Sequence, residues 1–493
     1  MVISKKQNIS ITNQKAKGRV YTPDYIVSNI LDFTGYNGLN ILERHIIDNS
    51  CGDGAFLIEI VKRYCEIARS INKPVDQIKM DLEQYIHGIE IDEEECEKCR
   101  QKVSITVKGF GITDIDWDIN CGDAMINSDY DGKMDYVVGN PPYVRVHNLL
   151  DTYETVKNFL FAQNGMTDLF IVFYEIGLKM LKQTGTLGYI TPSSFYNSVA
   201  GRDMRKYFVS NRNIKIVVDM KHFQPFEATT YTTIIILSKE RNDGVVEYFE
   251  YDVNNFIPVK ISNLNYSDFY FEGDFYFGKK NDLSELRKII SFHNIFSDIE
   301  VKNGFATLCD DFFIGDLPFD EYTIKVLKAS TKNWKKCLFP YDEYGKLIPY
   351  SILTQNPQIK LHYENNAERL NIRSLEKNAH WYGFGRSQGI NDVFKNKYAI
   401  NSLMRNIGDI KLCQCEPGTG VYSGLYILTK HTLDELKEIL LTEDFITYVS
   451  MLSKYKSGGY YTFSSKNLQK YLEYKFSERN ASKYEQLNFF ENA

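Results

Sequence analysis

The sequence predicts an α/β protein whose first half is a Rossmann-like domain with seven strands. Two observations lead to this prediction. Up to about residue 240, short apolar runs alternate with longer runs of helical periodicity, and several of the apolar runs end at a glycine or an acidic residue. The expected strands are His45–Asp48, Tyr85–Glu90, a segment ending near Ile119, Tyr136–Val138, Gly185–Thr191, Ile214–Met220 and Thr232–Leu237.

After Ser238 this alternation of strand and helix stops. A chain of 493 residues is also too long for a single hydrophobic core. We therefore expect residues 1–240 to form a first domain, residues 241–290 a connector without periodic structure, and residues 291–493 a C-terminal α+β domain.

Composition is that of a soluble globular protein, with 43% hydrophobic and 25% charged residues. The net charge of −6 argues against a protein that binds polyanions over its whole surface. Residues 331–493 nevertheless carry 22 Lys and Arg against 17 Asp and Glu, an excess of +5 that fits a nucleic-acid surface. There is no N-terminal apolar run and no long apolar segment, so we expect a cytoplasmic protein that does not enter the membrane.

The nine cysteines are scattered along the chain. Cys96 and Cys99 lie in a helical stretch rich in Glu and Lys, and Cys413 and Cys415 have no second pair at zinc spacing. The expectation is therefore free thiols and no metal site.

Residues 1–19 are polar and basic. A mobile tail is the simpler interpretation, and a basic arm that reaches a phosphate backbone is the alternative. In Tyr21-Thr-Pro23, Thr22 is placed to N-cap a helix whose first residue is Pro23. Such a helix start offers free N–H groups to an anion, for example a carboxylate.

The first predicted strand leads into a glycine-rich turn, Asn49-Ser-Cys-Gly-Asp-Gly54, and a helical pattern follows from Ala55 to about Ile71. Gly52 and Gly54 match the first part of a dinucleotide-binding fingerprint, but Leu57 occupies the third glycine position. We therefore expect a ligand without a pyrophosphate group against this turn.

Acidic residues lie at the end of the second predicted strand and just after the third. Glu90 stands where Rossmann-type sites hold ribose hydroxyls, whereas Asp92 is better explained as the cap of a helix beginning at Glu93. Asp123 follows the third strand and is placed to accept a hydrogen bond from an exocyclic amine, with Met125 as an apolar cover.

The strand Tyr136–Val138 continues through Gly139 into Asn140-Pro-Pro-Tyr143. The two prolines fix φ and remove two N–H donors, which predicts a rigid loop at the carboxyl end of a strand. The Asn140 side-chain oxygen and the Pro141 carbonyl can accept hydrogen bonds from an amino group while Tyr143 stacks on the ring that bears it. Taken alone, a plain Pro-Pro turn explains the stretch equally well. Between the last two predicted strands, Phe223 and Phe226 offer a second aromatic wall, and the alternative for one of them is a place in the hydrophobic core.

Three stretches of the last third mix basic, aromatic and small residues: Thr331–Lys336, His380–Gly389 and Lys454–Tyr461. Arg386 and Gln388, which flank Ser387, are the residue types that read guanine and adenine edges. The predicted DNA-binding residues are Arg386, Ser387, Gln388, Lys454 and Lys456. For each stretch the alternative is a solvated surface, and for Arg386 it is an ion pair with a local acid such as Asp392.

Taken together, these motifs resemble those of adenine-N6 DNA methyltransferases from type II restriction-modification systems. The resemblance is to the class with N-terminal cofactor motifs and a C-terminal recognition domain, and the motifs stand in that class's order. They are Tyr21–Pro23, Asp48–Gly54, Glu90–Asp92, Gly122-Asp123, Asn140–Tyr143 and the loop around Phe226. The glycine turn departs from the common pattern, since Asn49-Ser50 stand where Pro-Ala is usual.

The resemblance implies a Rossmann-like methyltransferase domain, S-adenosyl-L-methionine as cofactor, and site-specific adenine methylation of the EC 2.1.1.72 type. A flipped-out adenine in double-stranded DNA would be the acceptor, and a cognate restriction endonuclease would act on the same site. The implied cofactor residues are Tyr21, Thr22, Asp48, Ser50, Cys51, Gly52, Gly54, Glu90, Ile91, Asp123, Ala124 and Asn140. The implied catalytic residues are Asn140, Pro141, Pro142 and Tyr143, and the target base would contact Tyr143 and Phe226.

Two alternatives stay open at this point. Protein-glutamine N5 methyltransferases also use an Asn-Pro-Pro-Tyr motif, there to methylate a side-chain amide, but they need no long C-terminal domain. A non-catalytic DNA-binding subunit is the other alternative, and the intact tetrad argues against it.

Overall fold

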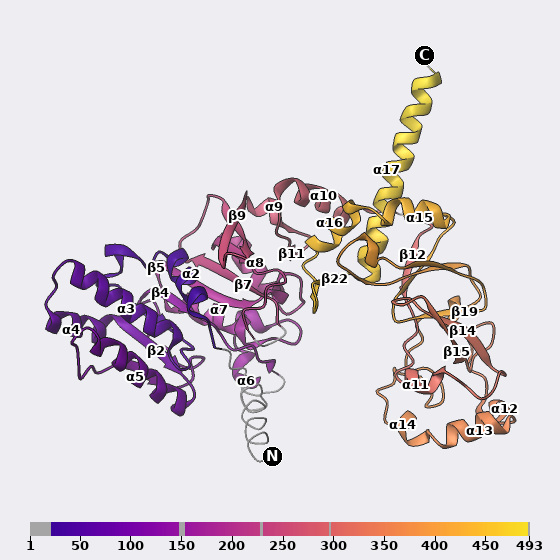
Figure 1. The fold of residues 1–493 in the computed structure, drawn as a ribbon, viewed down its shortest axis with the longest axis horizontal. Coiled ribbons are helices and arrows are strands. Elements are labelled where there is room, and N and C mark those ends of the chain that lie inside the picture. The colour runs from indigo at the N-terminus through magenta and orange to yellow at the C-terminus, as the bar shows by residue number, and fades with distance from the viewer. Residues whose placement is uncertain (1–20, 147–152, 227–229, 295–296, 492–493) are drawn as a thin grey trace. The chain divides into compact units, whose positions relative to one another are not determined.

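The structure is a computed structural model that describes residues 21–146, 153–226, 230–294 and 297–491. The chain divides into two compact units, with the division between Ser284 and Glu285 (Figure 1). The predicted basic arm at residues 1–19 lies outside the described residues.

The first unit is built on a nine-stranded mixed sheet with the order β3-β2-β1-β4-β5-β7-β6-β8-β9. Its strands are β1 (Ile46–Asp48), β2 (Ile86–Glu90), β3 (Asp118–Cys121), β4 (Met134–Gly139), β5 (Leu181–Pro192), β6 (Ile214–Asp219), β7 (Thr232–Ser238), β8 (Val246–Asp252) and β9 (Ile257–Leu264). The first five are parallel, and β7 is antiparallel to both of its neighbours. All seven predicted strands are present at their predicted places.

The helices of this unit connect the strands. They are α2 (Asp24–Thr34), α3 (Ala55–Ser70), α4 (Val75–Tyr85), α5 (Glu93–Lys108), α6 (Tyr153–Val156), α7 (Leu169–Met180), α8 (Arg202–Asn211), α9 (Tyr266–Phe269) and α10 (Lys280–Ser291), the last crossing the division. Short 3-10 turns are η1 (Gly38–Ile41), η3 (Leu160–Ala162) and η4 (Ser193–Tyr196), and a hairpin is formed by β10 (Tyr270–Phe271) and β11 (Asp274–Phe275).

Strand β5 shows how the helices divide between the two faces of the sheet. A Cβ at Gly188 would collide with Thr34 and lie 2.9 Å from Cγ2 of Ile30, both on α2. The adjacent residue Leu187 instead faces Gly177 of α7. Because neighbouring residues of a strand point to opposite faces, α2 and α7 cover opposite faces. Helices α3 and α5 share the buried core on the α2 side.

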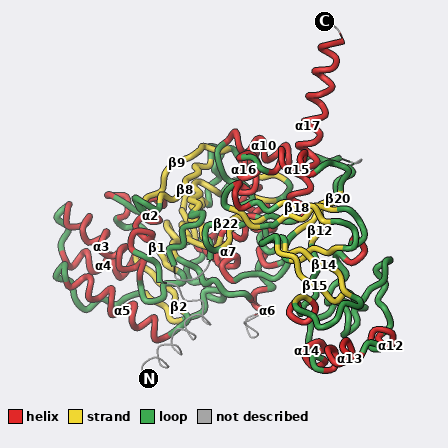
Figure 2. The backbone as a smooth tube through the Cα atoms, turned by 45° about the vertical axis from the view of Figure 1, so that its right-hand side comes forward, coloured by secondary structure: helices red, strands yellow, loops and turns green. Residues whose placement is uncertain are grey.

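The sheet has two more strands than predicted, because β8 and β9 extend it within the expected connector (Figure 2). Strand β8 pairs in parallel with β6, and β9 pairs with β8 at the outer edge. Most of the residues of β9 are exposed or half-buried, so its sequence carries no apolar alternation to reveal it. The prediction of an aperiodic connector over residues 241–290 was therefore wrong.

In its described residues the second unit contains three small sheets. Their orders are β12-β20-β16-β18, β13-β15-β14-β19 and β17-β22-β21. The strands are β12 (Glu300–Asn303), β13 (Ile314–Gly315), β14 (Thr323–Lys328), β15 (Asn333–Leu338), β16 (Lys397–Ile400), β17 (Leu403–Met404), β18 (Leu412–Cys415), β19 (Thr419–Tyr422), β20 (Leu425–Leu428), β21 (Tyr455–Lys456) and β22 (Tyr460–Thr462).

Helices and 3-10 turns surround these sheets. They are α11 (Asp310–Phe313), α12 (Tyr350–Leu353), α13 (Pro357–Glu364), α14 (Ala367–Asn371), η5 (Ile390–Asp392), η6 (Ile407–Asp409), α15 (Leu433–Leu440), α16 (Glu443–Met451) and α17 (Ser465–Glu491). Phenylalanines and tyrosines fill the larger core of this unit, which accounts for much of the high aromatic content there.

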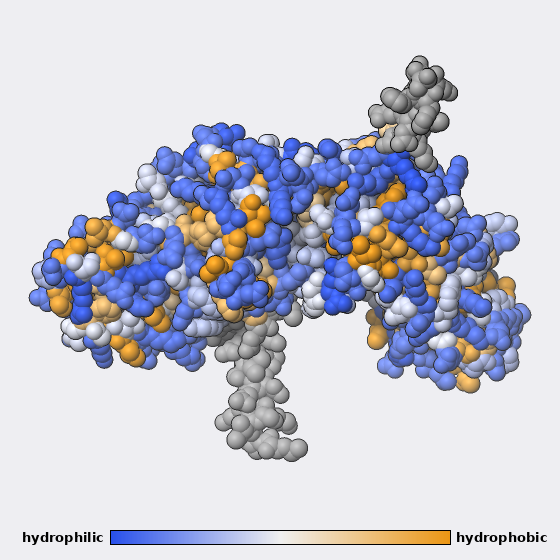
Figure 3. Space-filling model, turned by 45° about the horizontal axis from the view of Figure 1, so that its top comes forward, coloured by the Kyte–Doolittle hydropathy of each residue, from blue (hydrophilic) through white to orange (hydrophobic). Residues whose placement is uncertain are grey.

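The visible face of the molecule is mostly hydrophilic, and its hydrophobic side chains gather in separate patches (Figure 3). None of the helices within the described ranges has the length and apolar character needed to cross a bilayer.

The close approach of α2 to Gly188 gives a direct test of the packing. Gly188→Ala should lower the free energy of unfolding by about 1–3 kcal/mol, because the new methyl group overpacks the contact with Thr34 and Ile30. Chemical denaturation of the full chain measures this. Gly109→Ala is the matched control, since its Cβ would meet only Thr106 O at 3.4 Å, and we expect a change within about 0.5 kcal/mol. Equal effects of the two substitutions would contradict this account of the packing.

Candidate functional site

The predicted site residues of the first unit gather at one edge of the sheet. Asp48 ends β1, Glu90 ends β2, Cys121 ends β3 and Gly139 ends β4. These four strands are parallel, so their carboxyl ends meet at the same edge. That edge is where open α/β sheets bind ligands.

Asp48 is buried beneath this edge, with 1% of its surface exposed. Its Oδ1 accepts a hydrogen bond from the Ser50 N–H at 3.0 Å. On the neighbouring strand, Gly139 has φ of +154°, and a Cβ there would lie 2.8 Å from Asp48 Oδ1. Burial raises the pKa of Asp48 to about 8, so the isolated site holds this carboxyl group protonated at neutral pH. Gly139 is therefore required by the position of Asp48 as well as by its own backbone conformation.

Glu90 ties the glycine-rich turn to the end of β2. Its Oε2 accepts from the Gly52 N–H at 2.9 Å, and its Oε1 accepts from the Asp92 N–H at 3.0 Å. Asp92 itself caps α5 by accepting from the N–H groups of Glu94 and Glu95, as predicted. A carboxylate can accept about four hydrogen bonds, so Glu90 retains capacity for hydroxyl donors such as those of a ribose.

The loop after β3 lies beside Glu90. The Gly122 N–H donates to the Glu90 carbonyl at 2.9 Å, and Asp123 Oδ1 accepts from the Met125 N–H at 2.9 Å. Ala124 is buried, whereas Ile91 is 70% exposed and so offers an apolar surface next to the Glu90 backbone. A hydrophobic side chain left open beside two carboxylates suits a ligand with a flat apolar part and polar edges.

The Asn140 side chain is held by a residue that was predicted to cap a helix. Its Nδ2 donates to the hydroxyl of Thr22 at 3.1 Å, and Thr22 is almost fully buried. The cap position of α2 is occupied by Pro23, and no side chain caps the helix, so the prediction of Thr22 as the N-cap was wrong. The reason is that the Thr22 hydroxyl faces Asn140, which follows β4, rather than the first turn of its own helix. The bond at Nδ2 orients the amide, placing the Asn140 carbonyl oxygen on the side away from Thr22.

Tyr143 is anchored at its hydroxyl, which donates to the Ile190 carbonyl at 3.2 Å. Its ring stands edge-to-face against the ring of Phe226, with 6.2 Å between centroids and 71° between planes. It makes a second edge-to-face contact with the ring of Phe170. Phe226 is buried, and its ring contacts that of Tyr143, so the two residues predicted to contact the target base lie side by side. Residues 227–229 of the same loop lie outside the described residues.

The remaining cofactor candidates follow from these positions. Ser50, Cys51, Gly52 and Gly54 form the turn, and the Cys51 N–H donates to the Ile89 carbonyl at 2.9 Å. Tyr21 is 63% exposed, and its hydroxyl donates to Asp24. One supporting residue has no sequence signal: the Tyr189 hydroxyl donates to Asn49 Oδ1 at 2.8 Å and so braces the turn from β5.

The predicted DNA-binding residues lie in two segments of the second unit, the loop around Arg386 and the chain entering and forming β21. Arg386 and Ser387 are exposed, while the Gln388 side chain donates to the Gly304 carbonyl. Lys454 Nζ donates to Asn467 Oδ1 at 3.0 Å, and Lys456 is exposed. The alternative pairing of Arg386 with Asp392 is wrong, because Asp392 is engaged by Lys302, Lys395 and Tyr426.

The prediction that every cysteine is a free thiol was also wrong. The structure pairs Cys96 with Cys121 in a disulfide, with 6.0 Å between the Cα atoms. The first turn of α5 brings Cys96 against the end of β3. The two cysteines are 25 residues apart in sequence, so their contact cannot be predicted from local patterns. The other cysteines of the described residues are free.

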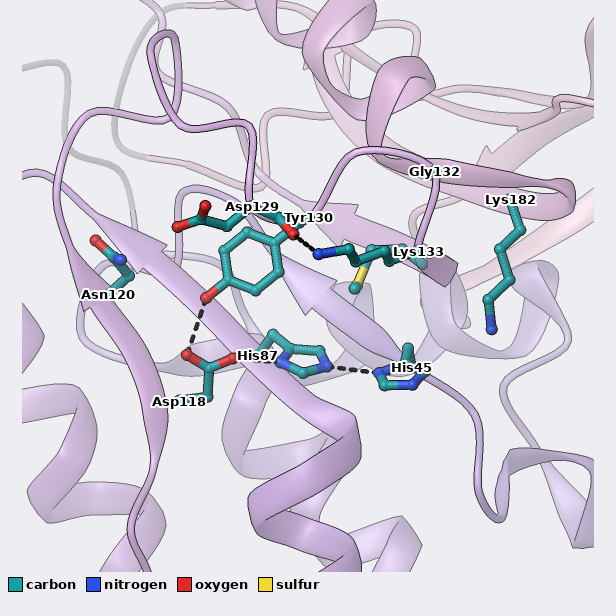
Figure 4. Close-up of a pocket in the computed structure, with 10 residues that line it drawn as sticks. His45, His87, Asp118, Asn120, Asp129, Tyr130, Gly132, Lys133 and Lys182 are labelled. Carbon is teal, nitrogen blue, oxygen red and sulfur yellow. Dashed lines mark hydrogen bonds and ion pairs between the residues drawn. The ribbon is translucent and has the colours of Figure 1, made fainter.

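A polar cavity of about 530 Å³ lies at the opposite, amino-terminal edge of the parallel strands (Figure 4). A chain of hydrogen bonds runs along it from His45 through His87 to Asp118, with 2.9 Å and 2.6 Å between the bonded atoms. The Tyr130 hydroxyl also donates to Asp118. This network joins the starts of β1, β2 and β3 and is separated from the Asn140 loop by the length of the strands.

Comparison with known proteins connects the first unit to restriction-modification methylases. Residues 58–226 match the family model described as Eco57I restriction-modification methylase. The chain is 32% identical over 247 residues to the type II methyltransferase M.BstVI of Geobacillus stearothermophilus, covering 46% of this chain and 43% of that protein. It is 23% identical over 495 residues to the type II restriction enzyme and methyltransferase RM.Eco57I of Escherichia coli, covering 78% of this chain and 49% of that protein. The matches thus span less than half the length of these relatives.

Among solved structures, the chain is similar to one described as the type IIL restriction-modification enzyme MmeI in complex with DNA. The TM-score is 0.62 at 13% identity, covering 90% of this chain and 63% of that chain. At this identity the likeness establishes a shared fold. The sequence matches confirm the resemblance to type II methyltransferases that the motifs predict.

The buried Asp48 predicts an unusual dependence of stability on pH. Its folded pKa of about 8 exceeds its ordinary value of 3.8, so the folded state retains a proton that the unfolded chain loses. The stability that this proton supplies is complete below about pH 4 and is lost as the pH rises through about 8. Asp48→Asn has no carboxyl group to titrate, so its stability does not fall in this way. Between pH 5 and 8 its free energy of unfolding should rise relative to that of the wild type, by at most about 1.4 kcal/mol per pH unit. Denaturant unfolding at a series of pH values measures the difference. Parallel pH profiles would contradict a protonated Asp48.

Proposed function

We propose that the protein transfers a methyl group from S-adenosylmethionine to N6 of adenine within a specific sequence of double-stranded DNA. The observation that carries the proposal is Asn140-Pro-Pro-Tyr143 at the end of β4, with the Asn140 amide oriented by Thr22. The matches to type II methyltransferases support DNA as the substrate.

The residues along the strand ends suit the cofactor. Glu90 can accept from the ribose hydroxyls, Ile91 can cover one face of the adenine, and Asp123 can accept from its amino group. Asp48 and the turn Ser50–Gly54 would line the methionine part. When bound, S-adenosylmethionine supplies a methyl group on a sulfonium centre. The absence of a third glycine is no obstacle, since no pyrophosphate has to approach the backbone.

The Asn140 loop provides what an amino-group acceptor needs. The lone pair of an adenine amino group is delocalised into the ring, so N6 is a poor nucleophile. Two acceptors, the Asn140 side-chain oxygen and the Pro141 carbonyl, would face the two N–H groups and stabilise the positive charge that develops on nitrogen. Both acceptors are held in place before the substrate arrives. The Asn140 amide is oriented by Thr22, and the backbone at Pro141 is restricted by its own ring and by that of Pro142. In-line transfer then depends on positioning, without a general base at the start.

The target adenine would leave the duplex to reach this loop. Its amino group is not presented to the acceptors inside the double helix, so the nucleotide must flip outward. Tyr143 would stack on the flipped base, with its ring fixed at the hydroxyl by the Ile190 carbonyl, and Phe226 would form the adjoining wall. Because the backbone carbonyl already anchors Tyr143, stacking costs little side-chain entropy.

The biological setting follows from this activity. Methylation would act in the bacterial cytoplasm and protect DNA from a cognate restriction endonuclease that reads the same sequence. The second unit would supply sequence recognition through Arg386, Ser387, Gln388, Lys454 and Lys456.

The test is transfer of tritiated methyl from S-adenosylmethionine to duplex DNA without added metal, followed by nucleoside analysis. N6-methyldeoxyadenosine is the expected product. Asn140→Ala should lower the single-turnover rate by about 10²–10³, because one preorganised acceptor is lost from the transition state. Binding of cofactor and DNA should be retained. Asn211→Ala, an exposed asparagine on α8, is the matched control and should keep the wild-type rate. A methylated cytosine, a methylated protein glutamine, or an unaffected Asn140→Ala rate would each contradict the proposal.

The bond between Thr22 and Asn140 makes a second prediction. Thr22→Val keeps the shape of the side chain but removes the acceptor, so the Asn140 amide loses its orientation. We expect kcat to fall about 10-fold, corresponding to about 1.4 kcal/mol, with little change in KM. Thr22→Ser restores the hydroxyl and should restore most of the rate. If Thr22 instead holds the cofactor carboxylate, Thr22→Val would raise KM for S-adenosylmethionine and leave kcat unchanged.

A further inference from the structure

Arg405, which follows β17 in the second unit, is held more firmly than exposed arginines usually are. Its guanidinium lies over the ring of Tyr460 on β22, 4.3 Å from the ring centroid. Asp409 accepts from its Nε at 3.1 Å and from its Nη2 at 3.5 Å, and it also accepts from the Arg405 backbone N–H. The side chain nevertheless stays 47% exposed.

The contacts of the guanidinium leave a defined edge for another partner. Asp409 occupies the side formed by Nε and Nη2, while the end formed by Nη1 and Nη2 still has N–H groups that point elsewhere. An exposed ion pair adds little to stability, so structural support alone does not explain this arrangement. Fixing a flexible side chain in advance does lower the entropy that a later partner must overcome.

The surface beside Arg405 permits close approach. Strands β21 and β22 form a hairpin, and its turn contains Gly458 and Gly459 with φ of +79° and +77°. These values belong to the left-handed region, which glycine adopts without cost. The atom nearest to a Cβ on Gly459 would be Cδ of Arg405, at 3.9 Å, so the hairpin tip and Arg405 form one surface. Lys456 and Ser457 are exposed on the same hairpin.

We infer that Arg405, braced by Asp409 and stacked on Tyr460, reads a guanine in the DNA recognition sequence through its Nη1–Nη2 edge. Two parallel N–H donors match O6 and N7 on the major-groove edge of guanine. Glycines at the hairpin tip let the backbone approach the groove, and Lys456 contacts phosphate beside it. This inference rests on the proposed function, because it requires duplex DNA as the substrate.

Arg386, the residue that the sequence favours for this role, differs from Arg405. No ion pair or ring contact of the Arg386 side chain is present among the described residues, although its backbone N–H donates to Ala306. An unrestrained arginine loses more entropy when it makes a bidentate contact. The two positions therefore divide into a prearranged base reader, Arg405, and a mobile contact for which phosphate is the commoner target.

The experiment begins with cells that express the full chain, in which long-read sequencing of modified adenine identifies the recognition sequence. Binding and methylation are then measured on the cognate duplex and on duplexes with 7-deazaguanine at one guanine at a time. Wild type should lose affinity at one of these guanines, because N7 is removed. Arg405→Ala should weaken binding to the cognate duplex about 5- to 150-fold. Placing 7-deazaguanine at that guanine should then cause the variant no further loss of affinity.

Three variants separate the possible roles. Arg405→Lys keeps the charge but lacks the fork, so it should bind nonspecific DNA normally and lose discrimination at that position. Asp409→Asn should loosen Arg405 and reduce the same discrimination about 3- to 10-fold. Arg369 is the matched control, since it also pairs with an aspartate, Asp311, and is 52% exposed. Arg369→Ala should leave the ratio of cognate to substituted DNA unchanged.

The outcomes that would overturn the inference are distinct. Equal loss of affinity by Arg405→Ala on every sequence, with a salt dependence reduced by about one unit, would make Arg405 a phosphate contact. An unchanged ratio across all the substituted duplexes would remove it from the recognition surface. A wild-type protein that methylates no DNA at all would refute the proposed function itself, which separates that failure from a failure of Arg405.

Discussion

The hydrogen bond between Asn140 and Thr22 is the contact on which the candidate catalytic site depends. It joins residues 118 positions apart and links the start of α2 to the loop that follows β4. The same helix packs closely on β5, where Gly188 leaves room for the side chains of Thr34 and Ile30. A residue at the start of a helix that precedes the sheet in sequence thus orients the amide of the Asn140 loop.

The sequence predicted the strands and the edge of the site well, for a physical reason. Buried parallel strands carry continuous apolar runs, and glycines and acids at their ends leave a local signature. Strand β9 left no such signature because its residues are mostly exposed at the sheet edge. The role of Thr22 could not be predicted, because a threonine before a proline looks the same in sequence whether its hydroxyl caps a helix or bonds to a distant residue such as Asn140. The Cys96–Cys121 pairing was hidden because it depends on how α5 packs against β3.

Sequence patterns were least informative in the second unit. Charge and aromatic content indicate a surface that binds nucleic acid, but they do not distinguish a restrained arginine from an unrestrained one. Arg386 lies in a loop whose composition suggests recognition, yet its side chain has no brace among the described residues. Arg405 lies in an ordinary stretch, and its stack on Tyr460 is created by strand pairing between β17 and β22. Only the fold brings these rings and charges together.

The glycine-rich turn shows how this site departs from dinucleotide-binding proteins. In their fingerprint the third glycine allows the helix to pack closely on the sheet. Here Leu57 stands at that position and is buried, and the space is provided instead by Gly88 on β2, where a Cβ would lie 2.9 Å from Leu57 Cδ1. The close contact between helix and strand is therefore kept, with the small residue moved from the helix to the strand. What remains at the turn is Gly52, whose N–H is already bound by Glu90. A turn braced by an acid in this way disfavours a pyrophosphate and leaves the carboxylate to accept from hydroxyl groups, as a nucleoside ligand requires.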